Sequence, residues 1–304
     1  MEGKDYPVSR TFYVNITYGC NSRCVFCASE KTNYGTRQPE ALPVREFIKF
    51  LESAGAGPKD HVMLNGGEPT IHKDFFQFIG AVNEKQAQLT VFTNGRRMAD
   101  HEFSQHLAEF APLEILVPIY SMEAHIHDGF TGIRGSLLQT LQGVANLFEM
   151  QAVGKDLMIE FRLLVSRYTG AYTIDTVRTL SRIYRSRRFT FSINPLIVSK
   201  KARIGGHATP LSELIPTFRQ LIEEIRATGR RPLLGNIPKC ILWQIRPELA
   251  MEGGSSRRAT TNEIYLDSYI REESRSNTKL FAAACNSCIP HPACLSSDIA
   301  FFTS

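Results

Sequence analysis

The chain has 304 residues, of which 43% are hydrophobic and 21% are charged, so it can bury the core of one large domain, alone or beside a small one. Its net charge of +5 is mild, and its basic clusters (Arg185–Arg188, Lys200–Arg203, Arg230–Arg231) lack an aromatic-rich RNA-binding motif, so nucleic acid is not the expected partner. Residues 1–10 have no apolar signal-peptide core, and no stretch is as long and apolar as a transmembrane helix. We therefore expect a cytoplasmic protein whose seven cysteines are metal ligands rather than disulfides.

Strand-like and helix-like patterns alternate along the chain. Apolar runs predict strands at Thr11–Ile16, His61–Leu64, Gln88–Thr93, Leu113–Tyr120, Leu157–Val165 and Phe189–Ile193. Helical spacing predicts helices at Pro43–Ser53, Asp74–Val82, His101–Phe110, Ser136–Met150, Ala171–Arg185 and Leu211–Ala227. Six alternations indicate an α/β fold with a parallel sheet and outer helices, and they place the active site at the carboxyl ends of the strands.

The segment from Tyr120 to Gly135 holds two histidines and an aspartate at close spacing, His125, His127 and Asp128. Such a group could ligate a metal. We interpret the segment instead as a loop that packs over the rim of the sheet.

Three cysteines follow the first predicted strand directly. Cys20, Cys24 and Cys27 have the spacing C-x3-C-x2-C. Three thiolates on one short loop can hold three irons of a [4Fe–4S] cluster and leave the fourth iron open to another ligand. A structural zinc site is the alternative, but zinc prefers four ligands, and neither Tyr18 nor Asn21 is an obvious fourth.

A glycine pair follows the second predicted strand. The segment Gly66–Thr70 reads Gly-Gly-Glu-Pro-Thr and comes just after the apolar run Val62–Leu64. Paired glycines let a ligand approach the backbone closely, and the carboxylate of Glu68 could accept a hydrogen bond from an ammonium group.

Polar residues also mark the later strands. Thr93 and Asn94 end the third strand, Ser121 follows the fourth, Arg162 lies within the fifth and Asn194 ends the sixth. Each alone is typical of a turn, but the carboxyl ends of parallel strands meet at one rim.

The cysteine loop and the Gly-Gly-Glu-Pro turn together resemble the radical S-adenosylmethionine (SAM) superfamily, over roughly residues 11–200. The resemblance implies a partial (β/α)6 TIM-like barrel, in which SAM chelates the open iron through its amino and carboxylate groups. It also implies that an electron from the cluster cleaves SAM to methionine and a 5′-deoxyadenosyl radical. The SAM-binding residues expected from it are Phe26, Gly66, Gly67, Glu68, Pro69, Thr93, Asn94, Ser121, Arg162 and Asn194.

Four further cysteines lie toward the C-terminus. Cys240 stands apart, and Cys285, Cys288 and Cys294 have the spacing C-x2-C-x5-C. Four thiolates could bind a second [4Fe–4S] cluster or one zinc ion. The resemblance favours an auxiliary cluster like those of SPASM regions or the shorter Twitch regions. The sequence lacks the cysteines for two auxiliary clusters, so we expect one.

These features predict two domains, a barrel at residues 1–230 and a Twitch-like iron–sulfur extension at residues 231–304. Within the extension, a linker should contain a short strand or helix around Ile264–Tyr269, since polar and glycine residues surround that apolar run.

The expected function is abstraction of a hydrogen atom from an unactivated carbon, with the cofactor supplying the chemistry. A ribosomal precursor peptide is one candidate substrate, because the segment from Val117 to Ser136 looks similar to peptide-maturing members. Only 19 residues precede Cys20, so a leader-binding protein, where needed, should be separate. A sugar, nucleoside or amino-acid derivative of natural-product assembly is the second candidate, and a non-catalytic iron–sulfur protein is the third. A flavodoxin or ferredoxin is the expected electron donor.

The fate of the substrate radical depends on Cys240. If Cys240 is a cluster ligand, all seven cysteines are used and no thiol remains as a hydrogen donor, which favours a dehydrogenation or a cross-link. If it is not a ligand, Cys240 is the candidate donor for an epimerisation, or the open iron of a three-ligand cluster could bind the substrate directly.

Overall fold

The computed structural model describes residues 10–27, 41–196, 205–207, 209–248 and 262–267. In this part of the chain, eight parallel strands form one sheet in the order β7-β6-β5-β4-β3-β2-β1-β8. The strands are β1 (Arg10–Thr17), β2 (Asp60–Gly66), β3 (Gln88–Phe92), β4 (Leu113–Pro118), β5 (Leu157–Val165), β6 (Phe189–Pro195), β7 (Leu233–Leu234) and β8 (Asn262–Asp267).

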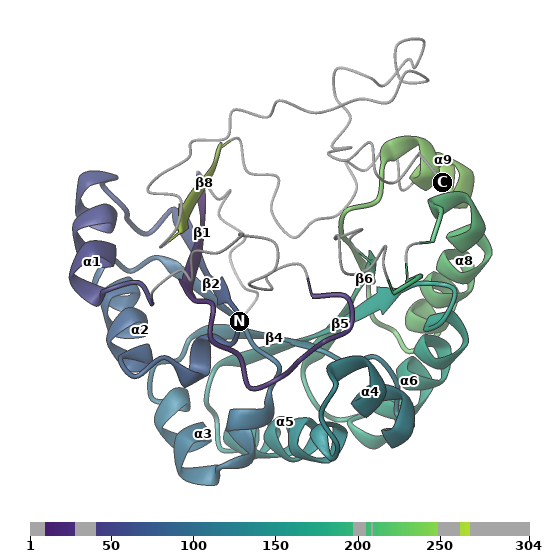
Figure 1. Cartoon of the computed structure of the whole chain (residues 1–304), viewed down its shortest axis with the longest axis horizontal. Helices are drawn as coiled ribbons and strands as arrows, with labels where there is room; N and C mark the ends of the chain where they lie inside the picture. The colour runs from purple at the N-terminus through teal and green to yellow at the C-terminus, as the bar shows by residue number, and fades with distance from the viewer. Residues whose placement is uncertain (1–9, 28–40, 197–204, 208, 249–261, 268–304) are drawn as a thin grey trace.

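The α-helices are α1 (Val44–Ser53), α2 (Phe75–Glu84), α3 (His101–Ala108), α4 (Ala124–Thr131), α5 (Ser136–Ala152), α6 (Gly170–Ile183), α8 (Leu211–Ala227) and α9 (Lys239–Ile245), with short 3-10 helices η2 (Pro69–Ile71) and η3 (Arg96–Ala99). Figure 1 shows the helices in an arc around the outside of a curved, open sheet. The predicted partial barrel is confirmed, because β1 to β6 and the helices that separate them lie where the sequence patterns place them.

β1 illustrates how the sequence builds the two faces of the sheet. Phe12, Val14 and Ile16 alternate along the strand and are fully buried. The ring of Phe12 packs edge-on against Phe50 of α1 at 5.6 Å, so these residues face the helices. The residues between them point to the inner face, where the carboxyl ends of the strands form the rim of the barrel.

Two short strands extend the barrel at its edges. β7 pairs with β6, and β8 pairs with β1 in a register that sets Arg10 opposite Asn262 and Asn15 opposite Asp267. β8 comes from the region where the sequence predicts a short strand or helix. The structure makes it a strand because β1 offers an unpaired edge, which a local pattern cannot reveal.

The interpretation of residues 120–135 as a loop is wrong, because α4 occupies the middle of this segment. Gly132, at φ 68°, ends α4 in the left-handed conformation that glycine adopts without strain. The Asp128 carboxylate accepts the backbone N–H groups of Gly135 and Leu137 at 2.5 and 2.9 Å and the Ser136 hydroxyl at 2.8 Å. Asp128 therefore joins α4 to the start of α5.

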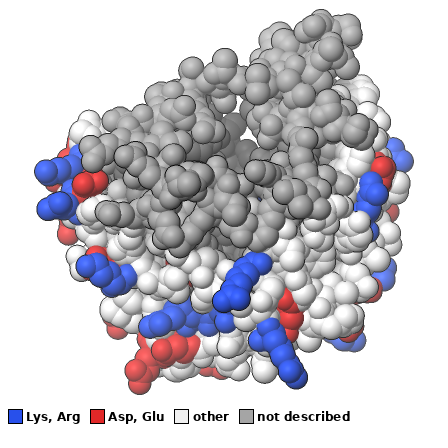
Figure 2. Space-filling view, in the orientation of Figure 1, with Lys and Arg blue, Asp and Glu red and all other residues white. Residues whose placement is uncertain are grey.

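Two observations on the described residues concern membrane-spanning helices and surface charge. No helix in the described ranges combines the length and apolarity that a bilayer crossing requires. Basic and acidic side chains of the described residues both occur on the face shown in Figure 2.

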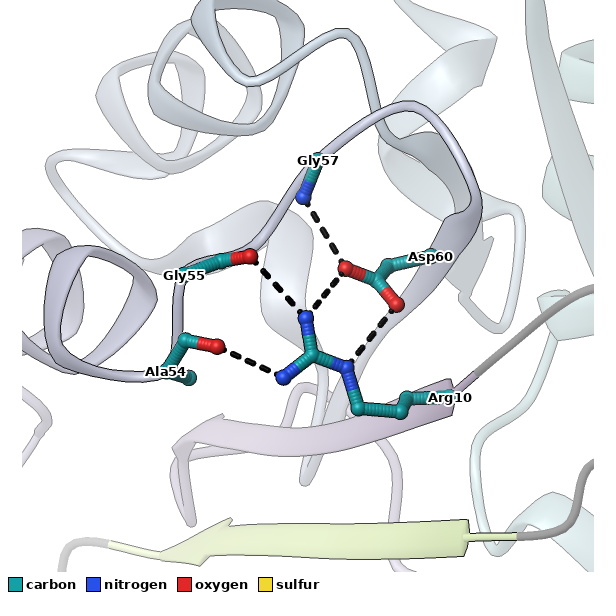
Figure 3. A network of polar contacts seen from close by, with 5 residues as sticks. All are labelled: Arg10, Ala54, Gly55, Gly57 and Asp60. Carbon is teal, nitrogen blue, oxygen red and sulfur yellow. Dashed lines mark hydrogen bonds and ion pairs between the residues drawn. The ribbon is translucent and has the colours of Figure 1, made fainter.

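Arg10 ties β1 to the connection between α1 and β2 (Figure 3). Its Nε and Nη2 donate to the two carboxylate oxygens of Asp60 at 3.0 and 2.7 Å. Nη1 and Nη2 also donate to the carbonyls of Ala54 and Gly55, at 2.6 and 3.0 Å, just past the end of α1. The Gly57 N–H donates to Asp60 at 2.9 Å, so the buried carboxylate is paired on both oxygens.

Arg10→Ala should lower the free energy of unfolding of the apoprotein by about 2–3 kcal/mol, because Asp60 would remain buried without its cation. Urea unfolding followed by circular dichroism measures this loss. Arg167→Ala is the matched control, since it breaks an exposed ion pair with Glu213 and should cost at most about 1 kcal/mol. Equal losses in the two variants would show that the Arg10 network is no more than a surface contact.

Candidate functional site

The cysteine loop leaves the carboxyl end of β1 and is anchored on α4. The Arg23 N–H donates to the carbonyl of Thr131 at 2.8 Å, and the Val25 N–H donates to the carbonyl of Phe130 at 3.0 Å. Within the loop, the Ser22 N–H donates to the Cys20 sulfur at 3.3 Å. The loop is therefore held by backbone contacts rather than by its cysteines alone.

The three thiols suit an iron–sulfur cluster. Cys20 is exposed, whereas Cys24 and Cys27 are partly buried. Desolvation of the thiols, with smaller contributions from the neighbouring cysteines, raises the pKa of Cys20 to about 11 and that of Cys24 to about 12. The sulfurs are thus close enough to interact, and binding a cationic centre would replace their protons. No three His, Cys, Asp or Glu side chains in the described ranges are grouped closely enough to hold a single metal ion.

Phe26 packs inward from this loop. Its side chain is 7% exposed and contacts Tyr120 edge-on at 5.2 Å and Phe130 at 5.8 Å. The ring therefore holds the loop against α4 and the end of β4. A SAM contact of Phe26 stays a prediction.

The glycine turn after β2 lies directly against the backbone of the cysteine loop. The Gly67 N–H donates to the Thr17 carbonyl at 2.6 Å, and the Glu68 N–H donates to the Gly19 carbonyl at 2.8 Å. A Cβ atom on Gly66 would lie 2.1 Å from the Thr17 oxygen, and one on Gly67 would lie 2.2 Å from the Gly19 oxygen. The sequence explains the glycines by the approach of a ligand, and the structure adds a different reason: only glycine lets the two loops touch.

Glu68 is a buried carboxylate that receives four hydrogen bonds. Its Oε1 accepts from the Thr70 N–H at 3.2 Å and from the hydroxyls of Thr70 and Thr93, both at 2.6 Å. Its Oε2 accepts from the Asn94 N–H at 2.7 Å. Burial raises the pKa of Glu68, and these hydrogen bonds act against the rise. Pro69, the next residue, is buried and starts η2.

The turn after β3 connects Glu68 to the cysteine loop. The Asn94 amide donates to Asn21 Oδ1 at 2.6 Å and to Ser22 Oγ at 3.3 Å. Arg96 donates from Nη1 to the Asn21 carbonyl and, at 3.3 Å, to Ser22 Oγ. Arg96 is absent from the residues expected from the sequence, where its only signal is its position directly after Thr93–Gly95.

Arg162 and Asn194 meet inside the barrel, on β5 and β6. Nη2 of Arg162 donates to Asn194 Oδ1 at 2.8 Å, and the guanidinium lies 5.1 Å from the centre of the Phe92 ring. Burial lowers the pKa of Arg162, and the neighbouring Glu160 carboxyl opposes this. A guanidinium has five N–H donors, so Arg162 has donors left for an anion.

Ser121 follows β4 and is 1% exposed. Its hydroxyl accepts from the Glu123 N–H at 2.9 Å, just before α4. This contact leaves the hydroxyl proton available for another acceptor.

The structure thus gathers the cysteine loop, the glycine turn and the Thr93–Asn94 turn. Ser121 follows β4, whereas Arg162 and Asn194 lie on β5 and β6. Cys240 lies on α9, partly buried against the apolar core. Cys285, Cys288 and Cys294 lie outside the described residues, so the auxiliary site stays a prediction.

Gly67→Ala should reduce iron binding, because the added methyl group would force the glycine turn away from the Gly19 carbonyl. Iron and sulfide per chain after anaerobic reconstitution measure this effect, and we expect at least half of the iron of the cysteine-loop cluster to be lost. Gly80→Ala is the control, since nothing lies within 4 Å of a methyl group there. Full iron binding by Gly67→Ala would mean that the contact does not shape the loop.

Part of the chain is similar in sequence to known proteins. A family model described as the radical SAM superfamily matches residues 14–159. The mycofactocin maturase MftC of Mycobacterium tuberculosis (strain CDC 1551 / Oshkosh) is 26% identical over 191 residues, which are 59% of this chain and 47% of the maturase. The GTP 3′,8-cyclase of Haemophilus influenzae (strain 86-028NP) is 28% identical over 149 residues, covering 47% of this chain and 43% of the cyclase. The chain spans about half the length of these relatives.

Solved structures share the fold. Streptococcus suis SuiB bound to S-adenosylmethionine superposes with a TM-score of 0.67 at 15% identity, covering 94% of this chain and 71% of SuiB. SuiB bound to its precursor peptide SuiA gives a TM-score of 0.62 at 16% identity, covering 86% of this chain and 58% of SuiB. The cysteine loop, the glycine turn and most of the two strands that carry them fall within residues 14–159, the segment that matches the radical SAM superfamily.

Proposed function

We propose that the protein is a radical SAM enzyme that abstracts a hydrogen atom from a ribosomally made precursor peptide. The observation that carries the proposal is the direct contact between the cysteine loop and the glycine turn, with Glu68 buried beside it. That arrangement sets three thiols and one carboxylate at the same rim, which suits one ligand that binds both a cluster and the protein.

Cys20, Cys24 and Cys27 would hold the [4Fe–4S] cluster of the family. Together with SAM, the bound cluster supplies the one-electron chemistry that generates a carbon radical able to take hydrogen from an unactivated carbon. The protein's own task is to bind SAM in one orientation and to exclude competing reactions.

Glu68 is the proposed partner of the SAM ammonium group. Within the described residues, Oε2 accepts one hydrogen bond, from the Asn94 N–H, and a carboxylate oxygen can accept two. Arg162, with its remaining N–H donors, is the proposed partner of the SAM carboxylate. The Ser121 hydroxyl and Asn194 are proposed to contact the ribose and adenine.

The names of similar proteins favour a peptide substrate. MftC is a maturase, and SuiB has been solved with a precursor peptide. A small-molecule substrate is the second candidate, favoured by the match to a GTP cyclase over 149 residues. A leader-binding partner and a flavodoxin or ferredoxin as electron donor complete the proposal.

An auxiliary [4Fe–4S] cluster on Cys240, Cys285, Cys288 and Cys294 is proposed as the acceptor of the second electron. With those thiols occupied, the substrate radical has no described free cysteine to take hydrogen from. We therefore propose an oxidation, a dehydrogenation or a cross-link, rather than an epimerisation.

Glu68→Gln should leave iron binding intact and lower the formation of 5′-deoxyadenosine by at least about tenfold, because a neutral amide binds an ammonium group more weakly. Chromatography of reaction mixtures with SAM and dithionite measures the product. Glu84→Gln, an exposed change at the end of α2, is the control and should react like wild type. Unchanged product formation by Glu68→Gln would remove Glu68 from the SAM site, and no product from wild type would favour the non-catalytic alternative.

The reaction type is tested by mass spectrometry of a precursor peptide incubated with enzyme, SAM and reductant. An oxidation yields a peptide lighter by two hydrogen atoms, and Cys240→Ala should lose both auxiliary iron and this product. A peptide of unchanged mass that gains one deuterium from heavy water would instead identify an epimerase. Modification of a nucleoside or sugar, with no change in any peptide, would favour the small-molecule candidate.

A further inference from the structure

Arg96 reaches from the end of β3 to the cysteine loop and is held from two sides. Its Nη1 donates to the Asn21 carbonyl and to Ser22 Oγ, whereas its Nε donates to Gln139 Oε1 of α5 at 2.7 Å. The guanidinium is thus fixed by hydrogen bonds to both its Nη1 and its Nε, rather than free to move in solvent.

These contacts bring the cation close to a proposed cluster ligand. Asn21 and Ser22 are the two residues after Cys20, and the Ser22 N–H donates to the Cys20 sulfur at 3.3 Å. Arg96 Nη1 thus lies one hydrogen bond away from each of the two residues that follow Cys20.

Within the described residues, no ion pair neutralises the charge of Arg96. No Asp or Glu oxygen within the described ranges lies within 4.0 Å of its guanidinium, and Gln139 is neutral. The next residue, Arg97, points elsewhere, because its guanidinium lies 5.2 Å from the centre of the Phe103 ring of α3. Among the described residues, Arg96 is the one of these two arginines that donates hydrogen bonds to the cysteine loop.

We propose that Arg96 is a positioning residue of the cysteine loop and that its charge raises the reduction potential of the cluster bound there. The proposal rests on cluster binding by Cys20, Cys24 and Cys27. Reduction adds one electron to the cluster, taken from the external donor, and makes the cluster more negative. A nearby fixed cation stabilises this reduced form more than the oxidised form.

The test compares Arg96→Gln, Arg96→Lys and Arg97→Gln with wild type in the reconstituted full chain. Iron and sulfide per chain are measured first, and the cluster potential is then determined by a redox titration followed by electron paramagnetic resonance. The signal of the cysteine-loop cluster is identified by its loss in Cys24→Ala. At a fixed solution potential, Arg96→Gln should lower the ratio of reduced to oxidised cluster about tenfold. For a one-electron couple, this corresponds to a reduction potential that is about 59 mV lower.

Arg96→Lys and Arg97→Gln should keep the wild-type potential, because the first retains a cation at the loop and the second removes a charge directed at Phe103. A wild-type potential in fully loaded Arg96→Gln, or an equal shift in Arg97→Gln, would overturn the proposal. A wild type that binds no cluster would instead refute the proposed function, so the two failures are distinguishable.

If the Arg96→Gln variant binds too little iron for a redox titration, the Gln139→Glu variant provides the test instead. The substitution sets a carboxylate against Nε of Arg96, which offsets the cation without removing its contact to the loop. It should leave iron binding unchanged and shift the ratio toward oxidised in the same direction. A potential equal to that of wild type in this variant would also overturn the proposal.

Discussion

The contact between the glycine turn after β2 and the loop after β1 is the constraint on which the rest of the site depends. Gly67 and Glu68 donate to the carbonyls of Thr17 and Gly19, and any Cβ on Gly67 would meet the Gly19 oxygen at 2.2 Å. Because β1 and β2 are parallel neighbours, their carboxyl ends meet at the same rim. Backbone atoms of the turn after β2 thus fix the path of the chain into Cys20.

Glu68 connects this contact to the turn after the next strand, β3. A buried carboxylate is costly unless it is hydrogen-bonded, and here Thr70, Thr93 and Asn94 supply four donors. The same Asn94 that donates to Glu68 from its backbone also donates to the cysteine loop from its side chain. The carboxylate, the turn after β3 and the loop therefore form one connected network, which favours a preorganised site.

Charge is distributed unevenly along that network. Glu68 is buried, whereas Arg96 is partly exposed and contacts Asn21 and Ser22 of the loop. Glu68 raises the pKa of Cys20, and Arg96 lowers it. A further cation, Arg162, lies inside the barrel. The site combines fixed charges of both signs at short range, which low polarity makes stronger than at the surface.

The two edges of the sheet are built differently from its middle. β1 to β6 follow the regular alternation of strand and helix, but β8 returns from late in the chain to pair with β1. An open parallel sheet has an exposed edge, and an added strand satisfies its backbone groups. Residues 231–304, the region expected as a C-terminal extension, therefore contribute two strands, β7 and β8, to the barrel sheet.

The sequence by itself determined the six strand–helix alternations, since residues such as Phe12, Val14 and Ile16 carry the period of a half-buried strand. It also determined the cysteine and glycine motifs, because their chemistry depends on spacing within a few residues. Only the tertiary structure decided the rest. α4 forms where Asp128 finds partners at the start of α5, and β8 forms where β1 offers an edge. The position of Arg96 beside the cysteine loop depends on contacts between residues more than 70 positions apart, which no local pattern records.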